Sequence, residues 1–150
     1  MHLADFLDPS AIRFNLHGNN REEVLAELVQ LLRLEDRAAQ SLLALVERRE
    51  RMGSTGFGRG IAIPHARSLV VSRLRVAFGT KPSGIPYNAV DDEPAKVFFL
   101  IVAPPREVSN QYLPVLGKVA QLCQQPEVPR LLTRLRNPDE LLALLKSHGV

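Results

Sequence analysis

The chain has 150 residues, of which 45% are hydrophobic, so it can bury the core of one domain without disulfides or a structural metal. Its formal charge is only +3 and both signs are mixed along the chain, which argues against a nucleic-acid partner. Cys123 is the single cysteine, which excludes an internal disulfide and a thiolate metal cluster. We therefore expect residues 1–150 to form one domain in a reducing compartment, the cytoplasm.

The N-terminal segment lacks the features of a targeting sequence. Residues 1–14 contain acidic side chains and a proline, where a signal peptide needs a basic start and an uninterrupted apolar stretch. The longest apolar run, residues 97–103, is far shorter than the roughly 20 residues needed to cross a bilayer. The sequence thus predicts a soluble protein without direct membrane insertion.

The first predicted elements are a strand and two helices. Residues 11–16 alternate apolar and polar side chains, as a half-buried strand does. Asn19 or Asn20 can cap a helix over residues 21–32, whose leucines and valines form an apolar stripe. A second helix opens at the acidic pair 35–36 and ends at Gly53.

The rest of the chain predicts a sheet followed by helices. A glycine-rich loop leads into the apolar run 61–64, and two further strands are predicted at 74–80 and 96–102, the last apolar enough to be covered on both faces. Helices are predicted at 109–124, 127–135 and 138–146, the last capped by Asn137. The expected fold is α/β: a three-layer domain with a mixed sheet of four or five strands and helices on both faces.

Residues 49–67 concentrate what a phosphoryl site needs. Glycines allow the backbone to approach an anion, Ser54 and Thr55 add hydroxyl donors, and Arg49, with the arginines at 51, 59 and 67, offers forked donors for phosphate oxygens. His65 supplies a nucleophile, because a neutral imidazole is available at cellular pH. Pro64 fixes the backbone before it, which predicts that His65 sits at a strand end.

Simpler interpretations exist for the same residues. A lone histidine is usually an ordinary surface or core-edge residue, and a glycine-rich loop is usually a plain turn. The loop matches neither the Walker A pattern nor the dinucleotide-binding fingerprint, so an ATP or NAD site has no support. The histidines also lack the spacing of a metal site.

A resemblance to a known family supports the interpretation of residues 49–67 as a phosphoryl-transfer site. RERMGSTG at 49–56 followed by GIAIPH at 60–65 resembles the signature of the fructose/mannitol-type EIIA domains of the bacterial phosphotransferase system, above all its nitrogen-regulatory members. The passage PSGIPYNAVDDEPAKVFFLIVAPP at 82–105 and the closing DELLALL at 139–145 extend the resemblance over nearly the whole chain.

The resemblance implies a function and its residues. In this family the histidine after Ile-Pro accepts a phosphoryl group from the phosphocarrier protein HPr, and the arginine of the Arg-Glu pair contacts the phosphate; these are His65 and Arg49. Ser54 and Thr55 are then donors beside the site. The chain would be a stoichiometric carrier without metal or organic cofactor, and its further partner would be either a regulatory target protein or an EIIB domain.

The chain departs from the family pattern at two positions. Ala66 stands where the family usually has glycine, and Tyr112 where it commonly has a second histidine. Tyr112 can donate a hydrogen bond to a phosphate or to His65 but holds no positive charge, which predicts a weaker or differently tuned phosphohistidine. The alternative for Tyr112 is a helix-surface tyrosine without a role. Cys123 lies in an apolar helical pattern and is expected to be a buried structural thiol.

Docking of a partner protein is expected to need an apolar rim around His65, for which Phe57, Ile61 and Ile63 are candidates, with Phe57 the most exposed. Three functions remain open at this point. The first is a regulator that signals through its phosphorylation state, which the MGSTG and IAIPH details favour. The second is a lone EIIA subunit of a sugar transporter, and the third is a binding module on the same fold that is no longer phosphorylated.

Overall fold

A strand buried along nearly its whole length, β6 (Ala95–Ala103), lies at the centre of the fold. The computed structural model describes residues 2–106 and 110–150. Its six-stranded sheet has the order β1-β5-β6-β3-β2, in which β1 is Leu7–Arg13 and β2 is Gly56–Gly58, with β4 (His65–Arg67) also paired to β6. The pairing of β6 is antiparallel to β5 (Arg75–Ile85) and parallel to β3 (Ile61–Ala62) and β4. The sheet is therefore mixed, as predicted, and β6 holds it together.

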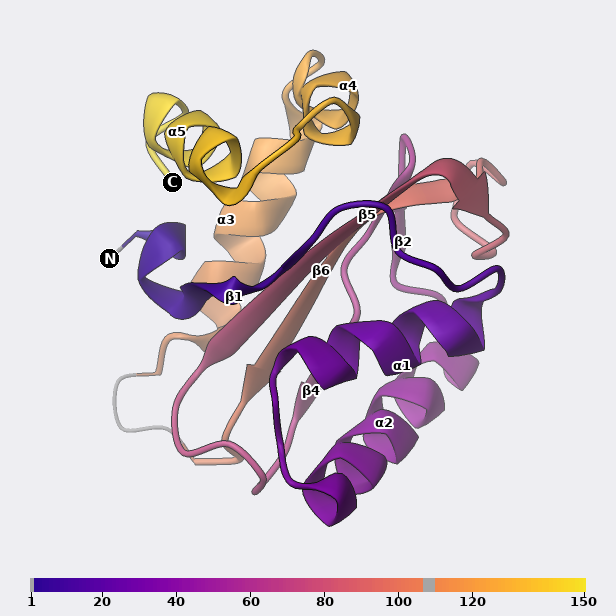
Figure 1. Cartoon of the computed structure of the whole chain (residues 1–150), viewed down its shortest axis with the longest axis vertical. Helices are drawn as coiled ribbons and strands as arrows, with labels where there is room; N and C mark the ends of the chain where they lie inside the picture. The colour runs from indigo at the N-terminus through magenta and orange to yellow at the C-terminus, as the bar shows by residue number, and fades with distance from the viewer. Residues whose placement is uncertain (1, 107–109) are drawn as a thin grey trace.

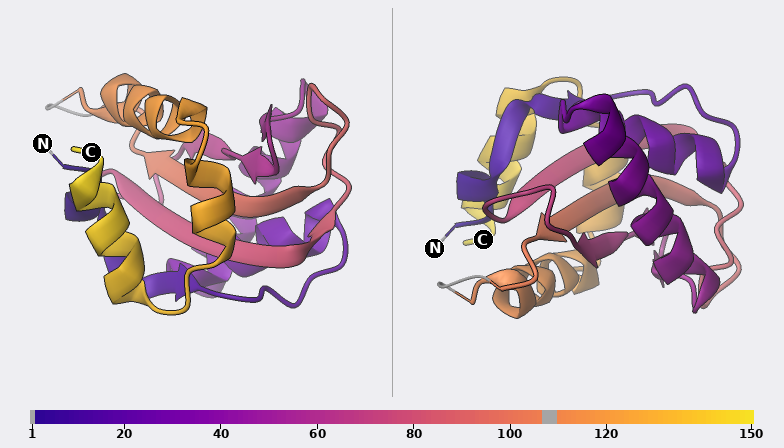
Figure 2. Two further views of the ribbon diagram at one scale, coloured as in Figure 1. Left: turned by 90° about the horizontal axis from the view of Figure 1, so that it is seen from above. Right: turned by 90° about the horizontal axis from the view of Figure 1, so that it is seen from below.

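Alternate residues of β6 enter two separate cores, because side chains along a strand point to opposite faces. Val97, Phe99 and Ile101 belong to the core under the C-terminal helices, whereas Phe98 and Leu100 belong to the core under α1 (Arg21–Leu31) and α2 (Asp36–Arg51). Figures 1 and 2 show α1 and α2 on one side of the sheet and α3 on the other. This arrangement confirms the predicted three layers and explains why residues 96–102 are apolar without interruption.

The N-terminal helices cover the first face. α1 (Arg21–Leu31) begins at Asn20, whose side-chain oxygen accepts a hydrogen bond of 2.9 Å from the backbone N–H of Glu23. Of the two candidate caps in the sequence, Asn20 is the one used. α2 (Asp36–Arg51) buries Leu42, Val46 and Glu50, which are spaced four residues apart on one side of the helix.

The glycine-rich segment forms a tight hairpin. β2 (Gly56–Gly58) pairs antiparallel with β3 through Gly58, Arg59 and Gly60, which have φ angles of 98°, 59° and 82°. Positive φ is costly for most residues and accounts for the two glycines. The hairpin delivers the chain into β3, and after Ile63 and Pro64 the chain continues as β4, of which His65 is the first residue.

The C-terminal helices cover the second face. They are α3 (Tyr112–Gln124), α4 (Val128–Thr133) and α5 (Pro138–Ser147), and Asn137 caps α5 through the N–H of Glu140 at 2.9 Å. The predicted start of the first of them, Ser109, lies outside the described residues. A 3-10 helix at Leu3–Phe6, which the sequence did not reveal, packs into the same core.

Two predictions need correction. The first strand, β1 (Leu7–Arg13), begins and ends earlier than the predicted 11–16. Pro9 obscured it, but proline is tolerated here because β1 is an edge strand, and Asn15, with φ of 60°, lies beyond its end. The sheet also has six strands where four or five were expected, because β2 and β4 are only three residues long.

Among the described residues, no helix is both long enough and apolar enough to cross a membrane.

We expect Asn20→Ala to lower the free energy of unfolding by about 1 kcal/mol, because it removes the side-chain oxygen that accepts from the Glu23 N–H at the start of α1. Asn19→Ala is the matched control, since the Asn19 side chain makes only a 3.4 Å contact with Lys81 Nζ at the surface. Urea denaturation of both variants measures the difference. Equal losses from the two substitutions would contradict the assignment of the cap.

Candidate functional site

His65 is held by one hydrogen bond that distinguishes its two ring nitrogens. Nδ1 lies 2.7 Å from the backbone carbonyl oxygen of Ile63, and a carbonyl can only accept. The neutral ring must therefore carry its proton on Nδ1 and leave a lone pair on Nε2. The His65 side chain is partly exposed, and Nε2 is its ring nitrogen with a free lone pair.

His65 lies in a hollow of about 530 Å³ between the end of α2 and the start of α3. The hollow is lined by residues from these two helices and from β4: Leu45, Arg48, Arg49, Met52, His65, Ala66, Arg67, Tyr112, Leu113 and Leu116. Three of the lining residues are arginines and none is acidic. The charge around His65 is therefore positive, which favours an anion there.

One face of α2, continued by its C-cap residue Met52, supplies four of the lining residues. Leu45, Arg48, Arg49 and Met52 follow the i, i+3, i+4, i+7 spacing of a single helix face. Arg49 also donates from Nη1 to the carbonyl oxygen of Gly53 at 2.7 Å, which holds its guanidinium at the helix end. Arg48, Leu45 and Met52 were not singled out from the sequence, although their helical spacing with Arg49 is the signal that could have found them.

Arg67 and Tyr112 form a stacked pair on the other side of the hollow. The Arg67 guanidinium carbon lies 4.3 Å from the centre of the Tyr112 ring, and its Nη1 donates to the carbonyl of Pro104 at 3.1 Å. The rings of Tyr112 and His65 have their centres 6.2 Å apart. Tyr112 is only 7% exposed, so it is a buried neighbour of His65 and not a tyrosine of the helix surface. A cation fixed over an aromatic face is thereby set beside the histidine.

Ser54 and Thr55 do not line the hollow, and their hydroxyl groups have other partners. Ser54 Oγ donates to the carbonyl of Tyr87 at 2.7 Å. Thr55 Oγ1 bonds a carboxylate oxygen of Glu50, and the Thr55 backbone N–H donates to the other oxygen of the same carboxylate at 3.0 Å. A direct contact of either hydroxyl with phosphate stays a prediction and would require these bonds to break.

Glu50 also belongs to this region, although sequence reasoning assigned no separate role to it. Its side chain is 3% exposed and accepts from the Thr55 N–H, the Thr55 hydroxyl and, at 2.8 Å, the Tyr87 hydroxyl. Burial, and then the nearby Glu50 charge, raise the pKa of Tyr87 far above its usual range, so its hydroxyl keeps its proton and donates. The signal that could have identified Glu50 is a carboxylate at a position that continues the buried stripe of α2.

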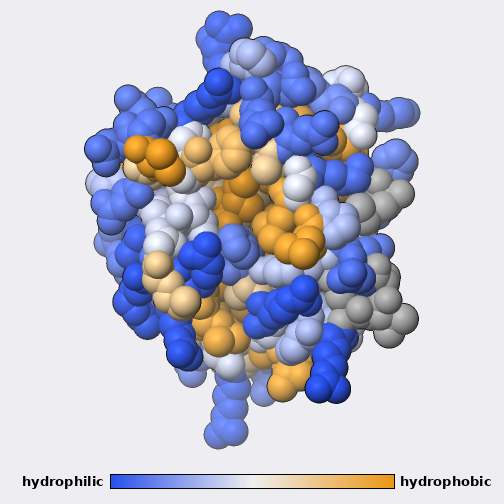
Figure 3. All heavy atoms as spheres, turned by 180° about the vertical axis from the view of Figure 1, so that it is seen from behind, coloured by the Kyte–Doolittle hydropathy of each residue, from blue (hydrophilic) through white to orange (hydrophobic). Residues whose placement is uncertain are grey.

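The apolar residues beside His65 differ from those expected. Ile61 and Ile63 are 1% and 7% exposed, and Phe57 is half-buried against the core, so they do not form a rim. Leu113, Met52 and Leu45, which are 68%, 77% and 37% exposed, line the hollow instead. Figure 3 shows one face of the molecule on which hydrophobic side chains lie among hydrophilic ones.

The remaining candidates lie elsewhere. Arg59 donates to the carbonyl of Gln124 at 3.0 Å, and neither it nor Arg51 lines the hollow. Cys123 is fully buried in the core, and burial raises the pKa of its thiol to about 12, which confirms a structural thiol. Within residues 2–106 and 110–150, no three His, Cys, Asp or Glu side chains come together as a metal site.

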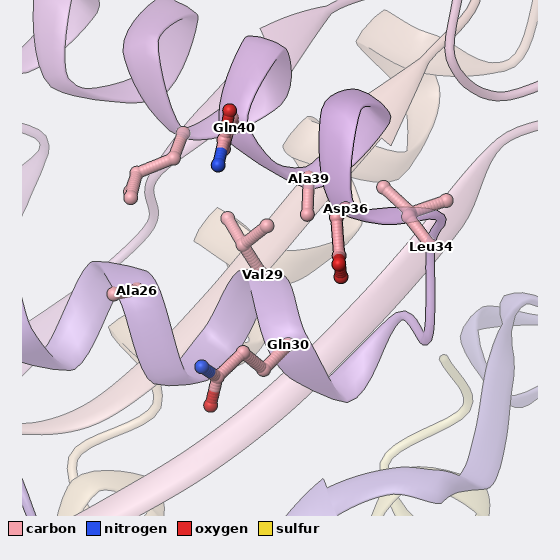
Figure 4. Close-up of a pocket in the computed structure, with 8 residues that line it drawn as sticks. Ala26, Val29, Gln30, Leu34, Asp36, Ala39 and Gln40 are labelled. Carbon is pink, nitrogen blue, oxygen red and sulfur yellow. The ribbon is translucent and has the colours of Figure 1, made fainter.

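A second hollow, of about 300 Å³, lies between α1 and α2. Figure 4 shows that Val29, Ala39 and Leu34 contribute apolar side chains to it and that Asp36 is its acidic group. Its lining contains neither a histidine nor an arginine, unlike that of the hollow at His65.

We expect ¹⁵N NMR of the free protein to show the neutral His65 ring with a protonated Nδ1 and an unprotonated Nε2, because the Ile63 carbonyl accepts only from Nδ1. His17, which is exposed, serves as the comparison and should show exchange between tautomers. A proton found mainly on Nε2 of His65 would contradict the geometry.

Comparison with known proteins agrees with this fold. Residues 5–148 match the family described as "Phosphoenolpyruvate-dependent sugar phosphotransferase system, EIIA 2". The fructose-specific EIIABC component of Bacillus subtilis is 31% identical over 99% of this chain, which spans 24% of that protein. The nitrogen regulatory protein of Bradyrhizobium diazoefficiens is 25% identical, over 97% of this chain and 95% of its own length.

The crystal structure of the nitrogen regulatory protein IIA-Ntr from Neisseria meningitidis superposes with a TM-score of 0.86 at 26% identity, over 95% of this chain and 98% of that one. The resemblance carried by residues 49–65 is thus confirmed. The family match covers nearly every residue of the chain, including His65 and both helices that border it. The chain belongs to the EIIA 2 family of the phosphoenolpyruvate-dependent sugar phosphotransferase system.

Proposed function

We propose that this chain is a phosphocarrier and regulatory protein of the phosphotransferase system, reversibly phosphorylated on Nε2 of His65 by an HPr-type phosphocarrier protein. The observation that carries the proposal is the hydrogen bond from Nδ1 to the Ile63 carbonyl, which leaves the lone pair of the neutral ring on Nε2, in a histidine that lines the hollow. The three arginines that line the same hollow support it, since guanidinium groups bind phosphate oxygens in bidentate fashion.

The transfer balances without a cofactor or an external base. The Nε2 lone pair of His65 forms a bond to phosphorus while the phosphorus–nitrogen bond of the donor phosphohistidine breaks and returns its electron pair to the donor ring. The proton on Nδ1 of His65 stays in place throughout. Because the phosphorylated ring gains positive charge, its Nδ1–H bond to the Ile63 carbonyl becomes charge-assisted and strengthens.

The arginines have complementary roles in this proposal. Arg49 contacts the transferred phosphate from the α2 side, where its bond to Gly53 holds it. Arg67 contacts the phosphate from the β4 side. Tyr112 contributes indirectly, because the Arg67 guanidinium stacks on the Tyr112 ring. Arg67 then supplies the positive charge that Tyr112 lacks. Ser54 and Thr55 act by fixing the loop before β2 through Tyr87 and Glu50.

A regulatory role is favoured over a transport role by the similarity to IIA-Ntr, at a TM-score of 0.86. In that role, target proteins in the cytoplasm bind according to the phosphorylation state of His65. The transport alternative has its own support, because the fructose-specific EIIABC component of Bacillus subtilis is 31% identical. In that case an EIIB cysteine receives the phosphoryl group from His65. A binding module that is never phosphorylated is the third possibility.

We expect incubation with phosphoenolpyruvate, enzyme I and HPr to give one acid-labile phosphoryl adduct, detected by intact-protein mass spectrometry. His65→Ala should abolish the adduct, whereas His17→Ala, which changes an exposed histidine outside the hollow, should retain it. No adduct on the wild-type protein would refute phosphorylation and favour the binding module. Loss of the adduct on addition of a fructose-type EIIB domain, with gain of phosphate by that domain, would favour transport.

We expect Arg49→Ala to slow phosphoryl transfer from HPr by about 10²-fold, because it removes a fixed charge from the developing negative oxygens. Arg67→Ala should slow it by about tenfold or more for the same reason. Arg51→Ala is the matched control, since Arg51 is exposed at the end of α2 and does not line the hollow. Rapid-quench single-turnover measurements compare the three, and equal rates for all of them would contradict the roles of Arg49 and Arg67.

A further inference from the structure

Glu50 occupies a position where α2 otherwise buries aliphatic side chains. Leu42 and Val46 precede it at intervals of four residues, and it is buried to the same degree. Burying a carboxylate is unfavourable unless donors satisfy it. Thr55 and Tyr87 provide these donors, with two bonds from Thr55 and one from the Tyr87 hydroxyl. The carboxylate therefore ties α2 firmly to the loop that follows it.

A chain of hydrogen bonds leads from this carboxylate to His65. Glu50 fixes the Thr55 backbone through its N–H at 3.0 Å. The Thr55 carbonyl in turn accepts from the N–H of Ile63 at 3.0 Å, and the Ile63 carbonyl accepts from Nδ1 of His65 at 2.7 Å. Each bond sets the position of the residue that makes the next one.

The same carboxylate also governs the second half of the site. Glu50 directly follows Arg49 in the last turn of α2, and Arg49 donates to Gly53, two residues before Thr55. The bonds between Thr55 and Glu50 therefore hold the short segment after Arg49 against the end of α2. The histidine and the arginine come from different elements, and Glu50 is bonded to the segment that joins them.

We propose that Glu50 is a positioning residue for His65 and Arg49: it fastens Thr55 to the end of α2 and thereby sets the Ile63 carbonyl that orients the histidine ring. The proposal rests on the proposed function of His65. Glu50 does not line the hollow, so it acts through Thr55 and Ile63 and not by touching phosphate. Its contribution is geometric, and a side chain of the same shape that still accepts from the Thr55 N–H should replace it.

Two variants separate this role from simple loss of stability. Glu50→Leu combined with Tyr87→Phe removes the carboxylate and its buried hydroxyl partner together, which limits the cost of leaving a buried polar group unpaired. Tyr87→Phe alone is the background for that double variant, because it leaves both Glu50–Thr55 bonds intact. Glu50→Gln is the rescue: its amide oxygen can accept from the Thr55 N–H, while its NH₂ group donates to hydroxyls that can also accept.

We expect the double variant to transfer the phosphoryl group at least about tenfold more slowly than Tyr87→Phe at saturating phospho-HPr, because small misplacements of reacting groups are costly. The phospho-HPr concentration for half-maximal rate should stay within about twofold, since Leu45, Met52 and Leu113 are unchanged. Glu50→Gln should stay within about threefold of the wild-type rate. A double variant that is as fast as Tyr87→Phe, or a Glu50→Gln variant as slow as the double variant, would overturn the proposal.

A spectroscopic readout separates failure of this proposal from failure of the proposed function. In the unphosphorylated double variant, ¹⁵N NMR should show His65 losing its single Nδ1–H tautomer, whereas Tyr87→Phe and Glu50→Gln should keep it. This measurement needs no phosphoryl donor, so it gives a result even if the wild-type protein is never phosphorylated. A double variant with the tautomer of the wild-type protein would overturn the positioning role on its own.

Discussion

The hydrogen bond between His65 Nδ1 and the Ile63 carbonyl is the interaction on which the site depends. A free neutral imidazole can carry its proton on either ring nitrogen. This bond fixes the proton of the neutral ring on Nδ1 and leaves the lone pair on Nε2. Pro64 follows Ile63, and the Pro64 carbonyl accepts from Ile101 in the central strand at 3.0 Å. The acceptor for the histidine is thus part of a backbone segment fixed by the sheet on one side and by Thr55 on the other. A surface loop would not hold a ring so firmly.

Much of the fold follows from local sequence rules, and its exceptions have physical causes. The uninterrupted apolar character of β6 predicted a central strand, and the asparagines at 19–20 and at 137 predicted two helix starts. The first strand was mislocated because Pro9 argues against a strand unless the strand lies at an edge, which is a property of the whole sheet. The short strands β2 and β4 are stabilised by pairing with β3 and β6, and three residues alone carry too little pattern to reveal them.

The candidate site was only partly visible in the sequence. His65 and Arg49 lie in one continuous motif, and both line the same hollow. Tyr112 and Leu113 come from a helix far along the chain; the resemblance pointed to Tyr112, whereas Leu113 became visible only in the folded structure. Ser54 and Thr55 look like phosphate ligands by residue type, yet their hydroxyls bond inward, because a buried carboxylate competes for them. Residue type alone does not show which way a side chain faces.

The hollow around His65 contains three arginines and no acidic lining residue. Under the proposed function this imbalance favours binding of the phosphorylated carrier over binding of the emptied one. A carrier protein that arrives with phosphate brings negative charge to a positive surface, and association is then fast. Once the phosphoryl group is on His65, it neutralises most of that surface, and the emptied carrier leaves an environment that no longer attracts it. The charge that recruits the donor is thereby consumed by the reaction, so product release is favoured without any change in the shape of the protein.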